Sequence, residues 1–206
     1  MTVRQAHQPG ARLLIVGPQG SGKGTQGARI AAAFGIPGVS TGDVFRANIQ
    51  DQTPLGQQVK AIIDAGDLVP DELTGAVVRD RLAQPDAANG FLLDGYPRNV
   101  SQVADLDGFL AERGESLDAV LELEVPREIS IERIALRAQE QGRSDDTDEA
   151  IARRLAIYES ETAPILDLYR ERGIVAAIDG VGSLDDVEQR INAALAGRGI
   201  ERAVAV

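Results

Sequence analysis

Short apolar runs alternate with longer stretches of helical periodicity along most of the chain. Four such runs occupy residues 12–17, 90–95, 117–125 and 173–180, and each ends near Gly, Asp or Pro. They are too short for helices, and runs rich in leucine and β-branched residues are typical of strands buried on both faces. We therefore predict a strand at each of these four places.

Helical patterns fill the spaces between the runs. We predict helices over residues 23–33, 43–50, 55–65, 71–83, 99–113, 127–138, 147–171 and 184–196. Strand and helix in repeated alternation form right-handed βαβ units, in which helices cover both faces of a parallel sheet. The predicted fold class is therefore α/β, with three layers around a central parallel sheet.

Two stretches interrupt this alternation. Residues 41–70 are helical and turn-like without a convincing strand, and residues 138–149, AQEQGRSDDTDE, are polar with no apolar period. Mobile covers over active sites are drawn from such weakly packed segments, although a polar stretch is more often a solvated loop. We expect both stretches to be excursions from one core, which 206 residues with 43% hydrophobic side chains can bury.

Composition excludes several kinds of chemistry. The chain has no cysteine and a single histidine, His7, so disulfides, thiol catalysis and Cys/His zinc sites are excluded. Residues 1–11 lack an apolar signal core, and no apolar stretch is long enough to cross a bilayer. We expect a soluble, cytoplasmic protein.

The charge of the chain argues against two classes of partner. A formal net charge of -11 disfavours nucleic acid and anionic membranes, because both require broad basic surfaces. Lysine occurs only at Lys23 and Lys60, and arginine, whose planar guanidinium suits phosphate, supplies the remaining positive charge. An anionic ligand would therefore need a local basic pocket.

A glycine-rich turn follows the first predicted strand. Gly17, Gly22 and Lys23 fit the pattern G-x-x-x-x-G-K between a predicted strand and a predicted helix. Backbone N–H groups and the positive end of the helix then form a cradle for phosphate, with the lysine at the outer phosphates. The usual hydroxyl comes one position late, at Thr25 after Gly24, which argues against direct magnesium ligation by this loop.

The same stretch carries a competing pattern. Gly22, Gly24 and Gly27 also fit G-x-G-x-x-G, and Asp43 follows at the distance of about 20 residues expected for dinucleotide binding. That pattern should begin where the strand ends, whereas Gly22 lies five residues beyond Gly17. The phosphate loop is therefore the favoured interpretation.

A second chemical stretch is FLLDGYPRNVSQ, residues 91–102. Here a buried strand delivers Asp94 to its carboxyl end, where a carboxylate could orient magnesium through water. A GTP-specific switch would need an Asn/Thr-Lys-x-Asp base reader, and neither lysine supplies one.

From residue 12 to about residue 196 the sequence resembles the adenylate kinases. The motifs that carry the resemblance are GPQGSGKGT, STGDVFR, DAGDLVPDE, FLLDGYPR with Gln102, and GRSDDTDEAIARRL. The resemblance implies a P-loop fold with a five-stranded parallel sheet, which converts MgATP and AMP to two ADP and back. It also implies a monomer of the short-lid type, with magnesium but no zinc.

The resemblance also implies an organisation within a single P-loop kinase domain, residues 1–206. The core would comprise residues 12–40, 71–137 and 150–196. Residues 41–70 would form a subdomain that binds the nucleoside monophosphate (NMP), and residues 138–149 a short lid. Residues 1–11 and 197–206 would be terminal extensions.

Site residues carry over position by position. The resemblance implies ATP contacts from Gly20, Ser21, Gly22, Lys23, Gly24, Thr25, Arg133, Arg137 and Gly182. It implies AMP contacts from Thr41, Gly42, Arg46, Asp67, Leu68, Val69, Gly95, Tyr96, Pro97, Arg98, Gln102, Arg143 and Arg154. Catalytic roles fall to Lys23, Arg98, Arg133, Arg137, Arg143 and Arg154, and Asp94, with Asp43 as a second candidate, would hold magnesium through water.

Spacing independently supports part of this set. Arg133 and Arg137 are four residues apart, so they share one helix face and can meet one anion. The alternative for any single arginine is a surface ion pair with a nearby carboxylate. Phosphoryl transfer needs alignment and charge neutralisation more than covalent chemistry, which suits a chain without a usable His or Cys.

Two other functions remain open at this point. Pyrimidine-monophosphate relatives carry Ala and Asn where this chain has Thr41 and Gln102, so these residues favour AMP over UMP or CMP. A UMP/CMP kinase is the nearer alternative, and a P-loop ATPase or switch is the more remote one. Gln19 stands where relatives often have Pro.

Overall fold

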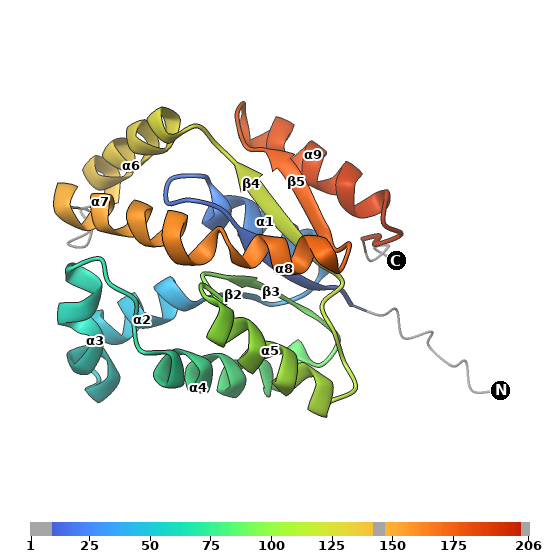
Figure 1. Cartoon of the computed structure of the whole chain (residues 1–206), viewed down its shortest axis with the longest axis horizontal. Helices are drawn as coiled ribbons and strands as arrows, with labels where there is room; N and C mark the ends of the chain where they lie inside the picture. The colour runs from blue at the N-terminus through green and yellow to red at the C-terminus, as the bar shows by residue number, and fades with distance from the viewer. Residues whose placement is uncertain (1–9, 142–146, 203–206) are drawn as a thin grey trace.

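The computed structural model describes residues 10–141 and 147–202. Its centre is a five-stranded parallel sheet in the order β2-β3-β1-β4-β5 (Figure 1). The strands are β1 (Arg12–Val16), β2 (Gly38–Ser40), β3 (Phe91–Asp94), β4 (Ala119–Glu124) and β5 (Val175–Asp179). The four strands predicted from apolar runs and the α/β fold class are confirmed.

Strand β2 has no counterpart among the four apolar runs. It is only three residues long, lies at one edge of the sheet and pairs with β3 alone in the described part of the chain. Only Val39 of this strand is buried. A short edge strand with one buried side chain produces no apolar run, so only the family resemblance indicated a fifth strand.

Helices connect the strands at the predicted places. They are α1 (Lys23–Phe34), α2 (Thr41–Gln50), α3 (Pro54–Asp64), α4 (Asp71–Leu82), α5 (Val100–Glu112), α6 (Arg127–Gln141), α7 (Asp148–Ile157), α8 (Ile165–Glu171) and α9 (Leu184–Ala196), with a 3₁₀ turn at Pro85–Ala87. Side chains of Ser40, Thr53, Asn99, Thr147 and Ser183 each accept a backbone N–H at a helix start. These caps satisfy donors that the first helical turn leaves open, so the starts are encoded locally.

The prediction of one continuous helix over residues 147–171 was wrong. Helix α7 passes into a π-helix, Tyr158–Thr162, and α8 begins only after Pro164. Proline lacks the N–H that a continuing helix requires, and a π turn is a common local interruption, often found at functional sites. The pattern of apolar positions continues across the interruption, which is why periodicity did not reveal it.

Both faces of the sheet are buried. On one face, Leu14 packs in a hydrophobic cluster with residues of α4, α5 and α8. On the other face, Leu13 packs in a second cluster with residues of α1 and α9. Alternate residues of one strand point to opposite faces, so a strand that is apolar at every position must be covered twice. The continuous runs in the sequence therefore have a direct structural cause.

Residues 41–70 lie at the side of the sheet (Figure 1). Helices α2 and α3 pack together around Phe45, Val59, Ile63 and Val69 in a separate hydrophobic cluster (Figure 1). The other predicted excursion comprises residues 138–149. Its first residues belong to the end of α6 and its last to the start of α7, and residues 142–146 lie outside the described part of the chain.

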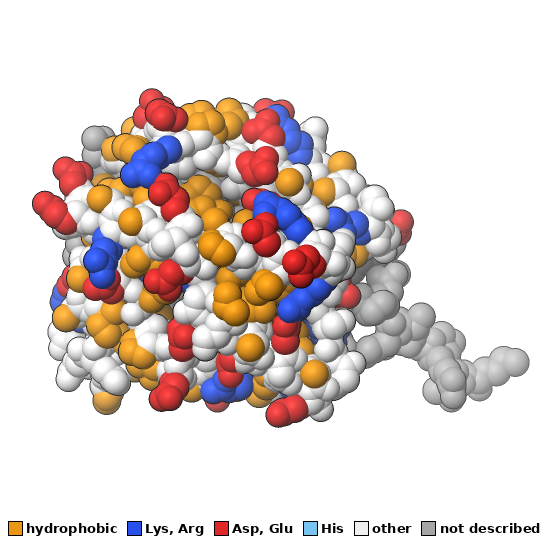
Figure 2. Space-filling model, in the orientation of Figure 1, with side chains coloured by type: hydrophobic (Ala, Val, Ile, Leu, Met, Phe, Trp, Pro, Cys, Tyr) orange, Lys and Arg blue, Asp and Glu red, His pale blue; other side chains and the backbone are white. Residues whose placement is uncertain are grey.

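The visible surface carries charges of both signs. Figure 2 shows Lys and Arg side chains interspersed with Asp and Glu on this face, without a broad basic area. Within residues 10–141 and 147–202, no helix has the length and apolar character to cross a membrane.

Candidate functional site

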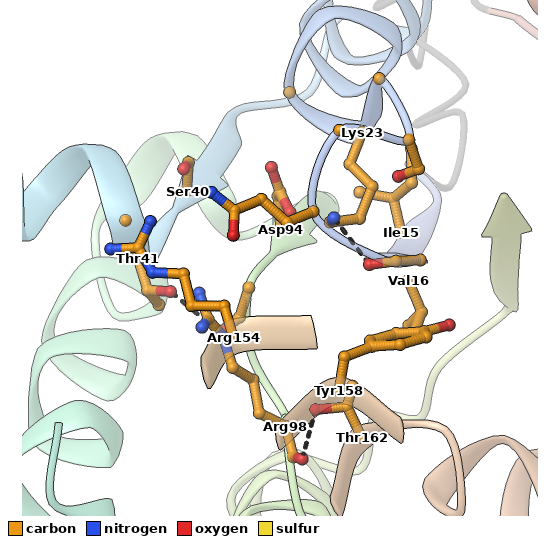
Figure 3. A pocket seen from close by; sticks show the side chains of 18 of the residues that line it. Ile15, Val16, Lys23, Ser40, Thr41, Asp94, Arg98, Arg154, Tyr158 and Thr162 are labelled. Carbon is orange, nitrogen blue, oxygen red and sulfur yellow. Dashed lines mark hydrogen bonds between the residues drawn. The ribbon is translucent and has the colours of Figure 1, made fainter. Parts of the chain in front are cut away.

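A cavity of about 900 Å³ lies at the carboxyl ends of the central strands. Its walls are the loop before α1, the start of α2, residues 66–69, the turn after β3, and parts of α6, α7 and α9 (Figure 3). Ligands of open parallel sheets bind at this edge, because the connecting loops and helix N-termini gather there.

The glycine-rich loop takes a conformation that only glycine accommodates. Gly20 and Gly22 have φ angles of 80° and 93°, and a Cβ at Gly20 would lie 2.3 Å from the carbonyl oxygen of Ser130. Helix α1 begins at Lys23, so its unpaired N–H groups and positive dipole end face the cavity. The loop is therefore shaped as an anion cradle, as its sequence predicts.

Lys23 lies within this loop beside a carboxylate. Its Nζ donates to the carbonyl oxygens of Gly17, at 2.7 Å, and of Pro18, at 2.8 Å. Burial lowers the pKa of Lys23 to about 8, an effect that the charge of Asp94 opposes. Burial likewise raises the pKa of Asp94, opposed by Lys23 and Arg98. The pair places one positive and one negative charge next to the glycine-rich loop (Figure 3).

Arginines from several elements line the same cavity. Arg133 on α6 donates to the carbonyl oxygens of Ser21, at 3.3 Å, and Gly180, at 3.1 Å, which ties α6 to the phosphate loop. Arg154 on α7 donates to the carbonyl oxygen of Ile63 at 3.1 Å, and Arg137 also faces the cavity. Among the described lining residues, six are Lys or Arg and three are Asp, so the cavity is a local basic pocket in an acidic chain.

A second polar group surrounds the turn after β3. The Thr41 hydroxyl and the Arg98 Nε both donate to the carbonyl oxygen of Gly95, at 2.9 and 2.8 Å. Burial lowers the pKa of Arg98, an effect that the neighbouring Asp94 opposes. Arg46 pairs with Asp43 at 2.6 Å one turn away on α2. Residues far apart in the sequence are thus brought to one side of the cavity.

Nearly all of the predicted site residues that the structure describes line this cavity. They are Gly20, Ser21, Gly22, Lys23, Gly24, Thr25, Thr41, Gly42, Asp43, Arg46, Asp67, Leu68, Val69, Asp94, Gly95, Pro97, Arg98, Gln102, Arg133, Arg137, Arg154 and Gly182. Arg143 lies outside the described residues.

Tyr96 is the exception. Its side chain is only 3% exposed and packs in the hydrophobic cluster beside α4 and α5, where its hydroxyl donates to Asp105 at 2.6 Å. The side chain therefore does not line the cavity, because the turn after β3 directs it into the core. A sequence motif by itself does not show which of its side chains contact a ligand and which pack in the core.

Several apolar side chains of the cavity wall were not predicted from the sequence, although Leu68, Val69 and Pro97 were. Phe45, Ile63, Leu136 and Tyr158 all line the cavity, and of these only Phe45 lies in one of the motifs, STGDVFR, which assigned it no contact. The π-helix that sequence analysis missed also contributes Thr162, whose hydroxyl donates to the carbonyl oxygen of Arg98 at 2.8 Å. Helical periodicity reports which residues are apolar, but not whether an apolar side chain faces the core or a cavity.

The carboxylates fit a cation that is held mainly by phosphate and water. Asp94 and Asp43 face the cavity, and the described residues hold no group of three or more His, Cys, Asp or Glu side chains suited to a metal. Magnesium in nucleotide enzymes typically uses one or two carboxylates plus substrate phosphates. The donor set present is of that kind.

Comparisons with known proteins agree on one family. The family model described as adenylate kinase matches residues 15–174. A protein named adenylate kinase from Leifsonia xyli subsp. xyli is 57% identical over 188 residues, which cover 91% of this chain and 94% of the relative. A protein of the same name from Clavibacter michiganensis subsp. michiganensis is 56% identical, over 92% of this chain and 94% of the relative. One from Kocuria rhizophila is 54% identical, over 89% of this chain and 98% of the relative.

Proposed function

The chain belongs to the adenylate kinase family, and from this premise we propose that it transfers a phosphoryl group reversibly from MgATP to AMP, giving two ADP. One observation carries the assignment of the site. A single cavity holds both the phosphate loop and the separate polar group around Gly95, with arginines from α6 and α7 along its walls. This arrangement supports the proposal of distinct places for two anionic substrates in one cavity.

For ATP we propose the phosphate loop as the binding element. The N–H groups at the start of α1 and the Nζ of Lys23 would contact the phosphates, with Arg133 and Arg137 beside them. Lys23 already has two carbonyl acceptors within 2.8 Å, so its charge is oriented before nucleotide binds. Gly182, at the start of the α9 region, would lie near the base of ATP.

For AMP we propose the group around Gly95. Arg46 and Arg98 would contact the single phosphate, and Thr41 and Gln102 the base. The backbone of residues 67–69 adds a further wall of the same cavity. The partly buried position of Arg98 supports this role, because a guanidinium held partly away from water interacts more strongly with an incoming anion.

The proposed chemistry is alignment and charge neutralisation. Lys23 and the arginines would stabilise the charge that develops on the equatorial oxygens of the transferring phosphoryl group, contributing about 3–5 kcal/mol for each critical group. Asp94, with Asp43 as a second candidate, would hold magnesium through water, and the ion would supply charge neutralisation for the phosphates. No residue of the cavity needs to form a covalent intermediate.

Exclusion of water would complete the mechanism. We propose that residues 41–70 cover the AMP side and residues 138–149 the ATP side, so that ATP is not hydrolysed when both nucleotides are bound. A separate hydrophobic cluster within 41–70 supports the proposal that this unit can move as one body. From the family resemblance we also propose a monomer as the working form.

The test is an assay of ADP formation from ATP with AMP, CMP, UMP and GMP supplied in turn. We expect turnover with AMP and at most slow turnover with the others. A clear preference for UMP or CMP would instead establish the pyrimidine-monophosphate kinase alternative. ATP consumption that is equally fast without any monophosphate would rule out the kinase assignment altogether.

A further inference from the structure

The side chain of Gln102 is held at both ends. It is only 2% exposed, yet it lines the cavity. Its Oε1 accepts from the backbone N–H of Arg98 at 2.8 Å, and its Nε2 donates to Oδ1 of Asp71 at 2.7 Å. Asp71, the first residue of α4, does not line the cavity. It therefore stands behind Gln102, on a different element.

These two partners fix which way the amide of Gln102 faces. A backbone N–H can only donate, and an ionised carboxylate can only accept. Turning the amide over would place Nε2 against the N–H of Arg98 and Oε1 against the carboxylate of Asp71, so both hydrogen bonds would become repulsive pairs. The bond to Asp71 is the stronger of the two, because hydrogen bonds to charged groups contribute about twice as much as neutral ones.

Asp71 is itself fixed by a second amide. Nδ2 of Asn99 donates to Oδ1 and Oδ2 of Asp71, at 3.0 and 3.3 Å. Oδ1 of Asn99 accepts the backbone N–H of Gln102 at 2.9 Å and so caps helix α5. The cap of α5, the start of α4 and the side chain of Gln102 therefore form one connected network.

We propose that Asp71 is a positioning residue that determines base specificity by locking the amide orientation of Gln102. The inference rests on the proposed function, in which Gln102 contacts the base of AMP. With one N–H and one lone pair used by Asp71 and Arg98, the amide keeps one donor on Nε2 and one acceptor on Oε1. The hydrogen bonds to Asp71 and Arg98 determine which end of the amide carries this donor and which carries the acceptor.

The fixed order suits one kind of purine edge. Adenine offers an acceptor at N1 beside a donor at its 6-amino group, which complements one donor and one acceptor of the amide. A 6-oxopurine offers the reverse, a donor at N1 and an acceptor at O6. A free amide would turn over to suit either purine, whereas a locked amide suits the adenine edge and not the 6-oxopurine edge. Cytosine has the same order as adenine, so the lock discriminates between 6-amino and 6-oxo purines and not against CMP.

The test uses Asp71→Asn with AMP and IMP as alternative substrates. The two nucleotides differ only at the edge in question, and an asparagine at position 71 can offer either a donor or an acceptor to Gln102. We expect the ratio of kcat/KM for AMP to that for IMP to fall about tenfold, with the loss for AMP chiefly in KM. A merely structural defect would lower both values together and leave the ratio unchanged.

Two variants serve as controls. Glu72→Gln removes a neighbouring acidic charge from the same first turn of α4, at an exposed position, and should leave the ratio as in the parent. Asp71→Glu keeps an acceptor-only group and should retain most of the preference for AMP. If Asp71→Asn does not fold, Asp71→Ser, which also removes the acceptor-only carboxylate, gives the same measurement.

A double-variant cycle separates the lock from other effects. In a Gln102→Ala background, Asp71→Asn should not change the AMP to IMP ratio further, because its action passes through Gln102. An unchanged ratio in Asp71→Asn, or an equal change with and without Gln102, would overturn the inference. If the parent chain itself does not phosphorylate AMP, it is the proposed function that fails, before any variant is measured.

Discussion

At the scale of single residues, Lys23 has the most demanding environment in the cavity. Its ammonium group is partly buried, has two carbonyl acceptors and interacts with the charge of Asp94. We expect Lys23→Met to lower kcat by about 10²–10⁴-fold, the effect of one critical charge at the transition state. The free energy of unfolding should fall little, because a buried charge is removed together with its desolvation cost. Steady-state kinetics and thermal unfolding measure the two effects.

The chain supplies a matched control for this variant. Lys60, its only other lysine, is exposed and pairs with Asp64 on the surface of α3. Lys60→Met should leave kcat within about twofold, because exposed ion pairs contribute little. A Lys23→Met enzyme with most of its activity would remove Lys23 from the proposed mechanism.

The pKa of Lys23 also predicts a pH-dependent signal. Burial lowers it to about 8 in the free protein, so at pH 9 the amine is mostly neutral. Polyphosphate beside the amine favours the charged form and raises the pKa again. ATP binding at pH 9 should therefore take up close to one proton, whereas at pH 7 Lys23 is already protonated and contributes none. Calorimetry in buffers of different ionisation enthalpy measures this uptake, which should disappear in Lys23→Met.

The variant Arg98→Ala tests whether the proposed AMP and ATP sites are separate. Arg98→Ala should raise KM for AMP by about 10–100-fold, because a charge-assisted contact to phosphate is lost. The Kd for ATP should change by less than about threefold. Arg81→Ala, which breaks only a surface pair with Asp86, is the control. Equal weakening of both nucleotides would place Arg98 elsewhere in the mechanism.

At the scale of elements, most helix and strand positions were predictable because their signals are local. A capping residue such as Ser183 bonds to a backbone N–H only three residues away, and the apolar runs of β1 and β3 are continuous in the sequence. Strand β2 and the π-helix were missed because their cause is tertiary. An edge strand of three residues is defined by its partner β3, and a π turn by what packs around it.

Packing between α2 and α3 gives a prediction that only tertiary structure can make. A Cβ at Gly56 of α3 would lie 2.0 Å from the carbonyl oxygen of Asn48 on α2, whereas a Cβ at Gly108 of α5 meets nothing within 4 Å. Gly56→Ala should lower the free energy of unfolding by about 1–3 kcal/mol through overpacking. Gly108→Ala should raise it by about 0.5–1 kcal/mol, the usual gain at an exposed helical position.

Both variants can be followed by denaturant unfolding and by KM for AMP. Gly56→Ala displaces the unit that carries Thr41 and Arg46, so KM for AMP should also rise. Gly108→Ala should leave it unchanged. Equal stability of the two variants would contradict the close approach of α2 and α3.

At the scale of the whole molecule, the function proposed here depends on one cavity that serves two nucleotides. A bisubstrate mimic, two adenosines joined through a chain of phosphates, should bind more tightly than ATP or AMP alone, because one molecule pays the entropy of association once. At about 100 times its Kd it should stabilise the fold by about 2.7 kcal/mol, which raises Tm by about 5–10 °C for a chain of this size. Thermal unfolding at equal concentrations of mimic, ATP and AMP compares the three.

The outcome of that comparison is informative in either direction. A larger rise in Tm with the mimic than with ATP would support two places in one cavity. No rise at all with the mimic would contradict the end-to-end arrangement of the two nucleotides, even if each single nucleotide binds.

The sequence by itself determined the fold class, the phosphate loop and the family, because each depends on residues that are close together in the chain. Apolar runs require a sheet covered on both faces, and Gly20, Gly22 and Lys23 form their cradle within one turn. Only the tertiary structure decided that Tyr96 packs in the core, that Thr162 contacts Arg98, and that Asp71 stands behind Gln102. These contacts join elements that are distant in sequence, and their geometry exists only once the sheet and helices are assembled.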